Sequence, residues 1–111
     1  MDQSIIKYIR DNWKKTINPK SNDVPFPFSS PSMSMYTDFF YWDLYFINKG
    51  LLLTGLDEQV ENNIKNMAYF VNKLGYIPNS TTQYLCDRTQ PPIFPLALYD
   101  LYLYRKDKKV I

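Results

Sequence analysis

The segment from Phe39 to Leu53 constrains the fold of this chain more than any other part of the sequence. Apart from Asp43, Asn48, Lys49 and Gly50, every residue in it is apolar or aromatic. Its length predicts a helix over about 38–54, with Gly55 as a left-handed residue at its end. A helix without a broad polar face is normally surrounded by other helices. The sequence therefore predicts an all-α fold of helical hairpins, in which this helix needs more than three companions.

Three further helices are predicted from apolar residues that recur every three or four positions. The first covers 2–17 and stops before Pro19. The second covers 57–74, with Asp57 as its cap and Gly75 after its last residue. A short turn makes it an antiparallel hairpin with the helix over 38–54. The last covers about 92–105, and its basic end is interpreted as a solvated helix terminus. No alternation typical of a strand is present.

The chain of 111 residues is interpreted as one incomplete domain. It divides into an N-terminal helix (1–18), a loop (19–37) and a helical segment (38–105). The loop is rich in proline and serine, but Val24, Phe26 and Phe28 can anchor it to the rest of the domain.

Composition excludes several classes of function. The net charge of +2 is too balanced to indicate a nucleic-acid partner, and no apolar run is long enough for a transmembrane helix. The absence of histidine removes Ser-His-Asp and Cys-His catalysis and most zinc sites. Three scattered glycines form no phosphate-binding loop. We expect no metal and no cofactor. The single cysteine, Cys86, and the charged N-terminus favour a cytoplasmic location.

One candidate binding pair is Trp42 and Asp43, at the start of the apolar helix. An aromatic plane beside a carboxylate is typical of sugar binding, because the ring packs on the C–H face and the carboxylate accepts hydrogen bonds from hydroxyls. The alternative is that Asp43 caps the helix or pairs internally and that Trp42 belongs to the core.

A second candidate is the loop from Gly75 to Pro92, which contains Asn79, Gln83, Arg88 and Gln90. Amides and a guanidinium suit a hydroxyl-rich ligand, since they offer fixed donors and acceptors. The alternative places Asn79 in a turn and pairs Arg88 with the neighbouring Asp87. Cys86 is interpreted as an inert buried thiol.

Together, the two segments resemble the α,α-trehalases, glycoside hydrolases built as an (α/α)6 toroid. The family's first signature reads roughly PGGRF-x-E-x-Y-x-WD-x-Y, and a later stretch reads IPNGNR-x-YYL-x-RSQPP. The resemblance covers about residues 25–100, and the spacing within the second stretch agrees without a gap. The identical residues here are Trp42, Asp43, Tyr45, Ile77, Pro78, Asn79, Tyr84, Arg88, Gln90, Pro91 and Pro92.

The resemblance implies that both segments line a glucose-binding subsite. Tyr36 and Trp42 would wall the sugar, while four polar side chains would bind its hydroxyls: Asp43, Asn79, Arg88 and Gln90. The family hydrolyses with inversion through an acid and a base. Both lie beyond the region that this chain matches, so no catalytic residue is expected here. The expected partners are a small carbohydrate such as trehalose and the missing C-terminal part of the toroid.

This sequence departs from the family pattern at several positions. Ser32 to Met35 replaces the proline, the glycine pair and the arginine of the first signature, and Ser80 to Thr82 replaces Gly-Asn-Arg in the second. The loss of that arginine leaves open which short α-glycoside is bound. An alternative function is a non-catalytic helical module that binds sugar or protein.

Overall fold

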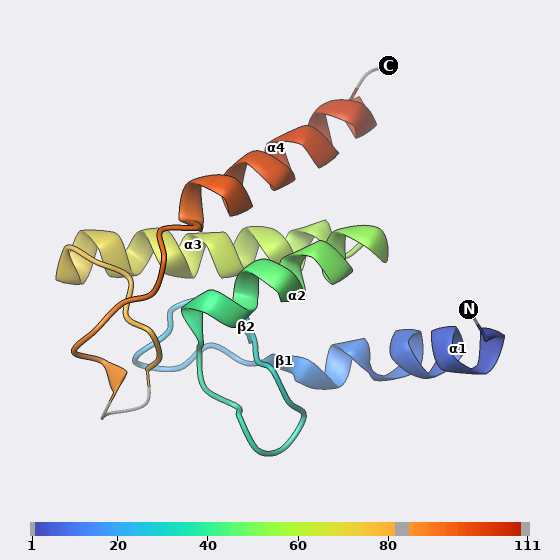
Figure 1. Ribbon diagram of the computed structural model, residues 1–111, viewed down its shortest axis with the longest axis horizontal. Helices are drawn as coiled ribbons and strands as arrows, with labels where there is room; N and C mark the ends of the chain where they lie inside the picture. The colour runs from blue at the N-terminus through green and yellow to red at the C-terminus, as the bar shows by residue number, and fades with distance from the viewer. Residues whose placement is uncertain (1, 82–84, 110–111) are drawn as a thin grey trace.

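The structure is a computed structural model that describes residues 2–81 and 85–109 (Figure 1). Four α-helices make up most of the described chain, together with one 3-10 helix and one pair of two-residue strands. In chain order the elements are α1 (Gln3–Asn12), η1 (Trp13–Thr16), β1 (Ile17–Asn18), β2 (Phe28–Ser29), α2 (Tyr41–Leu53), α3 (Asp57–Leu74) and α4 (Phe94–Lys109). The prediction of an all-α fold is confirmed.

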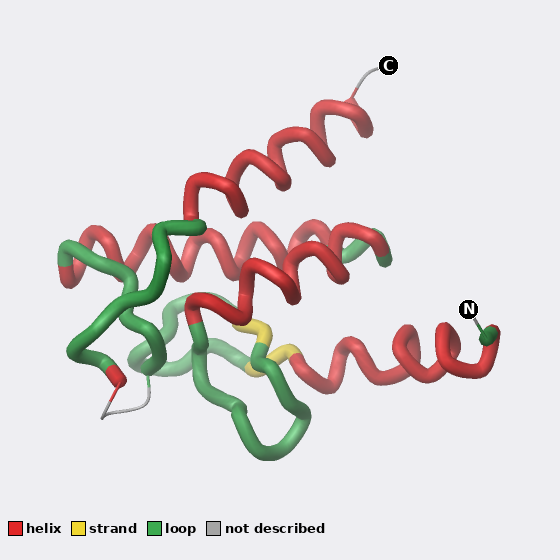
Figure 2. Tube along the Cα trace, viewed as in Figure 1, coloured by secondary structure: helices red, strands yellow, loops and turns green. Residues whose placement is uncertain are grey.

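Helices α2 and α3 form the predicted antiparallel hairpin, and α4 packs against both of them (Figures 1 and 2). Gly55 and Gly75 both have positive φ, at 78° and 82°, as expected for residues that end helices. Pro95 falls in the first turn of α4, where a missing N–H costs little. Among the described helices, none is both long and apolar enough to cross a bilayer.

The N-terminal region differs from the prediction of one continuous helix. The α-helix ends at Asn12, a 3-10 turn follows, and Ile17–Asn18 then pairs antiparallel with Phe28–Ser29. This short strand pair forms although the sequence shows no alternation typical of a strand. The Asn18 side chain explains the pairing, because its Nδ2 donates to the Ser30 Oγ at 2.9 Å across the ends of the loop. Contacts of this kind leave no alternating pattern in the sequence.

Amide side chains of α3 hold the loop that precedes α2. Asn66 binds both main-chain polar groups of Phe26. Its Oδ1 accepts from the Phe26 N–H at 3.0 Å, and its Nδ2 donates to the Phe26 carbonyl at 3.1 Å. One turn earlier, the Asn63 Oδ1 accepts from the Ser29 N–H at 3.0 Å. Gln59 donates to the Pro27 carbonyl at 3.0 Å. We call Gln59, Asn63 and Asn66 the amide clamp. It fixes an extended segment by its backbone.

The start of α3 also differs from the prediction, because Asp57 does not cap it. Leu56 occupies the cap position without a side-chain hydrogen bond, and the Asp57 carboxylate instead accepts from Arg105 of α4 at 3.1 Å. Arg105 also donates to Glu61 at 2.9 Å and thereby lowers the pKa of Glu61. The interpretation of Arg105 as part of a solvated helix end is therefore wrong at that residue. It ties α4 to α3.

Helix α2 buries only one side in the described chain. Tyr41, Leu44, Asn48 and Leu51 are buried, whereas Trp42, Phe46 and Leu53 are exposed. Two core clusters lie along this buried side. One gathers around Leu44, Met67 and Phe70, and the other around Leu51, Val60 and Leu101. The exposed apolar residues fit the expectation that this helix needs further companions.

We predict that Gly50→Ala destabilises the fold, because a Cβ at this position would lie 2.5 Å from the Trp13 ring. Relieving that overlap must displace Trp13 and η1, at a cost of about 1–3 kcal/mol in the free energy of unfolding. Chemical denaturation measures the loss. Leu53→Ala is the control on the same helix, because Leu53 is 88% exposed and should change stability by less than about 0.5 kcal/mol. Equal stability of the two variants would contradict the proposed close contact.

Candidate functional site

The start of α2 lies against the segment that follows α3. Phe40 and Ser80 form an isolated antiparallel bridge. On one side of it, the Thr81 N–H donates to the Phe39 carbonyl at 3.0 Å, and the Phe39 N–H donates to the Thr81 hydroxyl at 3.2 Å. On the other side, the Tyr41 N–H donates to the Asn79 carbonyl at 2.9 Å. We call residues 39–41 and 79–81 the junction. It joins the two sequence motifs through their backbones.

The junction also explains why α2 begins at Tyr41 and not at Asp38. Phe40 has extended backbone angles and no side-chain oxygen that could cap the helix. A buried N–H group at a helix start needs an acceptor. The Asn79 carbonyl supplies this acceptor for Tyr41. Residues 39–40 therefore pair with the neighbouring segment and do not become part of the helix.

The loop after the junction folds back onto it. The Asn79 N–H donates to the Arg88 carbonyl at 2.6 Å, and the Tyr76 hydroxyl donates to the Cys86 carbonyl at 2.6 Å. The Cys86 thiol donates to the Ser80 carbonyl at 3.3 Å. The interpretation of Cys86 as a buried thiol is wrong, because the residue is only half-buried. Asn79 and Arg88 are adjacent through their backbones.

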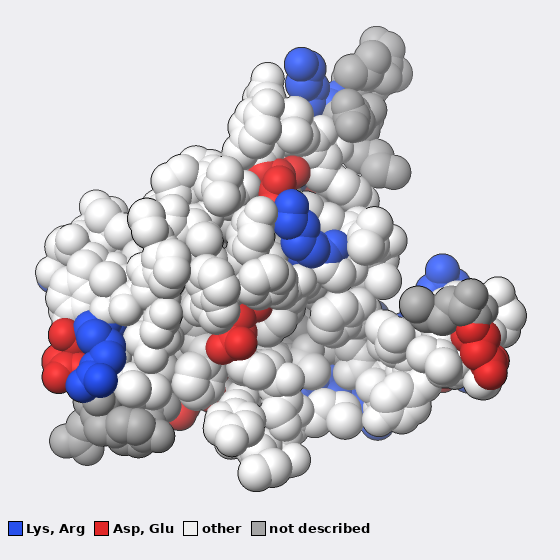
Figure 3. All heavy atoms as spheres, in the orientation of Figure 1, with Lys and Arg blue, Asp and Glu red and all other residues white. Residues whose placement is uncertain are grey.

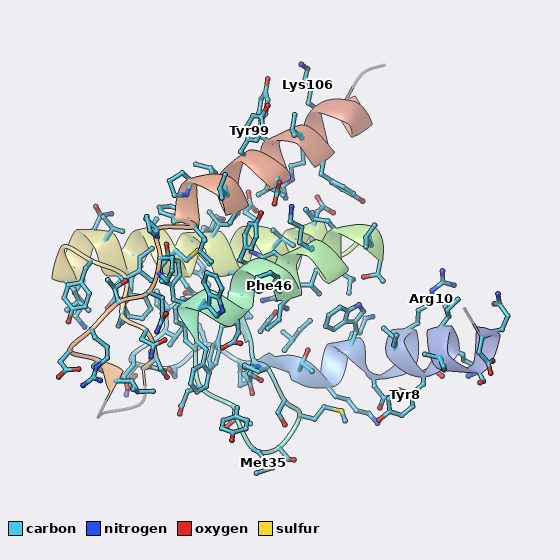
Figure 4. The ribbon with its side chains drawn as sticks, in the orientation of Figure 1. Tyr8, Arg10, Met35, Phe46, Tyr99 and Lys106 are labelled. Carbon is cyan, nitrogen blue, oxygen red and sulfur yellow. The ribbon has the colours of Figure 1, made fainter. Side chains whose placement is uncertain are left out.

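The two predicted aromatic walls are accessible. Tyr36 is 59% exposed and Trp42 is 39% exposed, so the alternative that Trp42 is a core residue is wrong in the described chain. The Trp42 ring meets Phe46 edge to face at 5.4 Å between centroids, and Tyr36 meets Phe40 in the same way at 6.2 Å. Figure 4 shows Phe46 on α2 and Met35 at the tip of the loop that carries Tyr36.

Asp43 is half-buried in the first turn of α2. The positive end of the helix dipole favours a carboxylate at this position. The alternative reading gave Asp43 an internal partner. Within residues 2–81 and 85–106, no hydrogen bond or ion pair of its carboxylate is found. Its oxygens can therefore accept from a ligand's hydroxyls.

Arg88 pairs with its neighbour Asp87, as the alternative interpretation expected. Its Nε donates to one Asp87 oxygen at 2.9 Å and its Nη2 to the other at 3.5 Å. The Arg88 guanidinium lowers the pKa of Asp87, chiefly through this hydrogen bond. Both side chains are exposed, at 59% and 72%, so the pair is weak and Arg88 can exchange this partner for another.

Gln90 lines a hollow of about 340 Å³ on the surface of the junction. Tyr41, Tyr76 and Phe94 line the same hollow. Tyr41 is buried, and this burial raises the pKa of its phenol. The hydroxyl accepts a hydrogen bond from the Phe94 N–H, at 2.9 Å.

The structure thus brings Trp42, Asp43, Asn79 and Arg88 to one end of α2 through backbone contacts, with Gln90 on the hollow beside it. Sequence reasoning missed Tyr41 and Thr81, which hold this arrangement together. Nothing in the local pattern marks either hydroxyl, since each bonds to a residue about 40 or more positions away. Gln83 and Tyr84 lie outside the described residues. Among the described side chains, none form an acidic, cysteine or histidine cluster that could hold a metal ion.

In this all-helical chain, the Trp42-Asp43 motif and the segment that begins at Asn79 thus meet at the start of one helix. The sequence profile of the family described as Trehalase matches residues 2–111, which is nearly the whole chain. The chain therefore belongs to the trehalase family.

Individual relatives agree with this assignment. The trehalase of Tenebrio molitor is 40% identical over 63 residues, which cover 57% of this chain and 11% of the relative. The human trehalase is 36% identical over 77 residues, which cover 69% of this chain and 13% of the relative. The periplasmic trehalase of Shigella flexneri is 32% identical over 103 residues, which cover 86% of this chain and 18% of the relative. The chain thus spans less than a fifth of the length of these relatives.

We predict that Thr81→Val loosens the junction, because it leaves the Phe39 N–H without its acceptor while preserving side-chain shape. The expected loss is about 1–2 kcal/mol in the free energy of unfolding. Amide exchange at Phe39, followed by NMR, should accelerate as well. Thr81→Ser keeps the hydroxyl and is the matched control. If valine and serine give the same exchange rate at Phe39, the hydroxyl does not hold the junction.

Proposed function

We propose that this chain supplies part of the glucose-binding subsite of a trehalase-type glycoside hydrolase. The substrate is trehalose or another short α-glycoside, and hydrolysis proceeds with inversion. The acid and base belong to a part of the enzyme that this chain does not match. A cytoplasmic location is part of the same proposal, on the ground of the single cysteine.

The observation that carries the proposal is the junction. In a member of the trehalase family, it holds the Trp42-Asp43 motif next to the loop that begins at Asn79. The exposed Trp42 ring would lie against the C–H face of a glucose unit. The Asp43 carboxylate, which has no partner within the described chain, would accept from two neighbouring hydroxyls. Tyr36 would form a second wall.

The polar side chains of the loop complete the proposed subsite. The Asn79 amide can both donate to and accept from sugar hydroxyls, and so can Gln90. Arg88 would exchange its exposed contact with Asp87 for a sugar oxygen, which costs little because that ion pair is solvated. Binding therefore requires a side-chain rearrangement at Arg88 but no movement of the backbone.

A second candidate function is a helical module that binds another protein, and the surface around α4 favours it. One apolar groove of about 670 Å³ runs between α3 and α4 beside Leu98 and Tyr102. Another of about 620 Å³ lies between α2 and α4 beside Leu53 and Leu103. Most of the surface in Figure 3 is uncharged, although Lys49 and Asp100 line the second groove. Exposed apolar area of this kind typically marks an interaction surface.

We predict that Asp43→Asn weakens binding of glucose and trehalose to the purified chain by about tenfold or more, because it removes charge-assisted hydrogen bonds to the sugar hydroxyls. Isothermal titration calorimetry or sugar-induced NMR shifts measure the dissociation constant. Asp11→Asn is the matched control, since Asp11 lies on α1 and pairs only with Lys7 among the described residues.

The two candidate functions give different outcomes. Sugar affinity that falls with Asp43→Asn and not with Asp11→Asn supports the subsite. No affinity for either sugar in the wild-type chain, together with stable association through the α4 surface in size-exclusion chromatography, supports the protein-binding module.

A further inference from the structure

We propose that Tyr41 is a positioning residue, whose backbone N–H holds Asn79 and whose phenolic hydroxyl holds the start of α4 beside Trp42 and Asp43. Its consequence for sugar binding rests on the function proposed above. Its mechanical role does not, because that role is defined by contacts within the described chain.

The first argument concerns the start of α4, which has no cap of its own. Ile93 precedes the helix and offers no side-chain acceptor, and Pro95 has no N–H. The Phe94 N–H donates to the Tyr41 hydroxyl at 2.9 Å. Helix caps normally come from the residue just before the helix. Here the cap comes from another helix, 53 positions earlier in the chain.

The second argument is that the backbone of the same residue reaches the loop. The Tyr41 N–H donates to the Asn79 carbonyl at 2.9 Å, and the Asn79 N–H donates to the Arg88 carbonyl at 2.6 Å. One residue therefore anchors the loop at both ends: at Asn79 through its N–H and at Phe94 through its hydroxyl. The connection from Arg88 to Phe94 is short and contains two prolines, which restrict it further.

The third argument is burial. Tyr41 is only 2% exposed, so its hydroxyl accepts from the Phe94 N–H within the packed chain. Burial also raises the pKa of the phenol, which is neutral at physiological pH even without this shift. The ring lines the same hollow as Gln90, so a shift of the ring would reach that side chain directly.

Packing of the ring is a separate contribution, because Tyr41 belongs to the core cluster around Leu44 and Met67. Tyr41→Phe separates the two effects. It keeps the ring and the backbone N–H and removes only the hydroxyl. Tyr69→Phe is the matched control, because Tyr69 packs against the same cluster from α3 and makes no hydrogen bond to α4 among those described.

The experiment compares wild type, Tyr41→Phe and Tyr69→Phe by NMR amide exchange and by titration with glucose and trehalose, well below the melting temperature. We expect exchange at Phe94 and Asn79 to accelerate about tenfold in Tyr41→Phe, while exchange at Met67 in α3 stays unchanged. We also expect the dissociation constant for the sugar to rise about fivefold. The control should show neither effect.

The two readouts separate the two proposals. Unchanged exchange at Phe94 and Asn79 overturns the role of Tyr41. Accelerated exchange with an unchanged sugar dissociation constant overturns its consequence for sugar binding, because the hydroxyl would then serve stability alone. If wild type binds neither sugar, the proposed function fails, and the exchange rates alone decide whether Tyr41 holds the loop.

Discussion

The fold depends on how the first turn of α2 satisfies its backbone. Phe40, the residue before this helix, has no side-chain oxygen that could cap it. Buried N–H groups cannot be left unpaired without a large cost in free energy. The backbone of residues 79–81 supplies the missing partners on both sides of Phe40. Two segments 40 positions apart are therefore fixed together by main-chain hydrogen bonds. Trp42 follows directly, and its ring stays accessible at the start of α2, which makes this end of the helix suitable for a binding site.

The amide clamp extends this logic to the loop before α2. Gln59, Asn63 and Asn66 lie on one face of α3 and bind main-chain groups of the loop. Burying three amides is tolerated because their bonding groups find partners in the loop or in each other. Apolar residues at these positions would fill the same space but could not hold an extended backbone. Helix α3 thus determines where the first motif begins, although none of its residues belongs to either motif.

The surface around α4 has a different character from the junction. Two mainly apolar grooves lie beside α4, and Leu96 and Tyr99 of the same helix are exposed (Figures 3 and 4). The relatives are several times longer than the matched region, and the further helices of a toroid would need apolar surfaces to pack against. A protein-binding module needs the same property. The apolar surface therefore favours contact with further protein, whereas the polar side chains around the junction favour the sugar subsite.

The sequence by itself determined the all-α class, the α2–α3 hairpin and its glycine-ended helices, because these depend on residues within one or two turns of each other. It also carried the family motifs, since residue identity and spacing are local properties. Only the tertiary structure decided that Asp57 pairs with Arg105 and does not cap α3, that residues 17–18 pair with 28–29, and that Tyr41 caps α4. Each of these contacts joins residues that are far apart in the chain. Which of several possible partners a polar group finds is settled by packing, and packing leaves no signal in the neighbouring sequence.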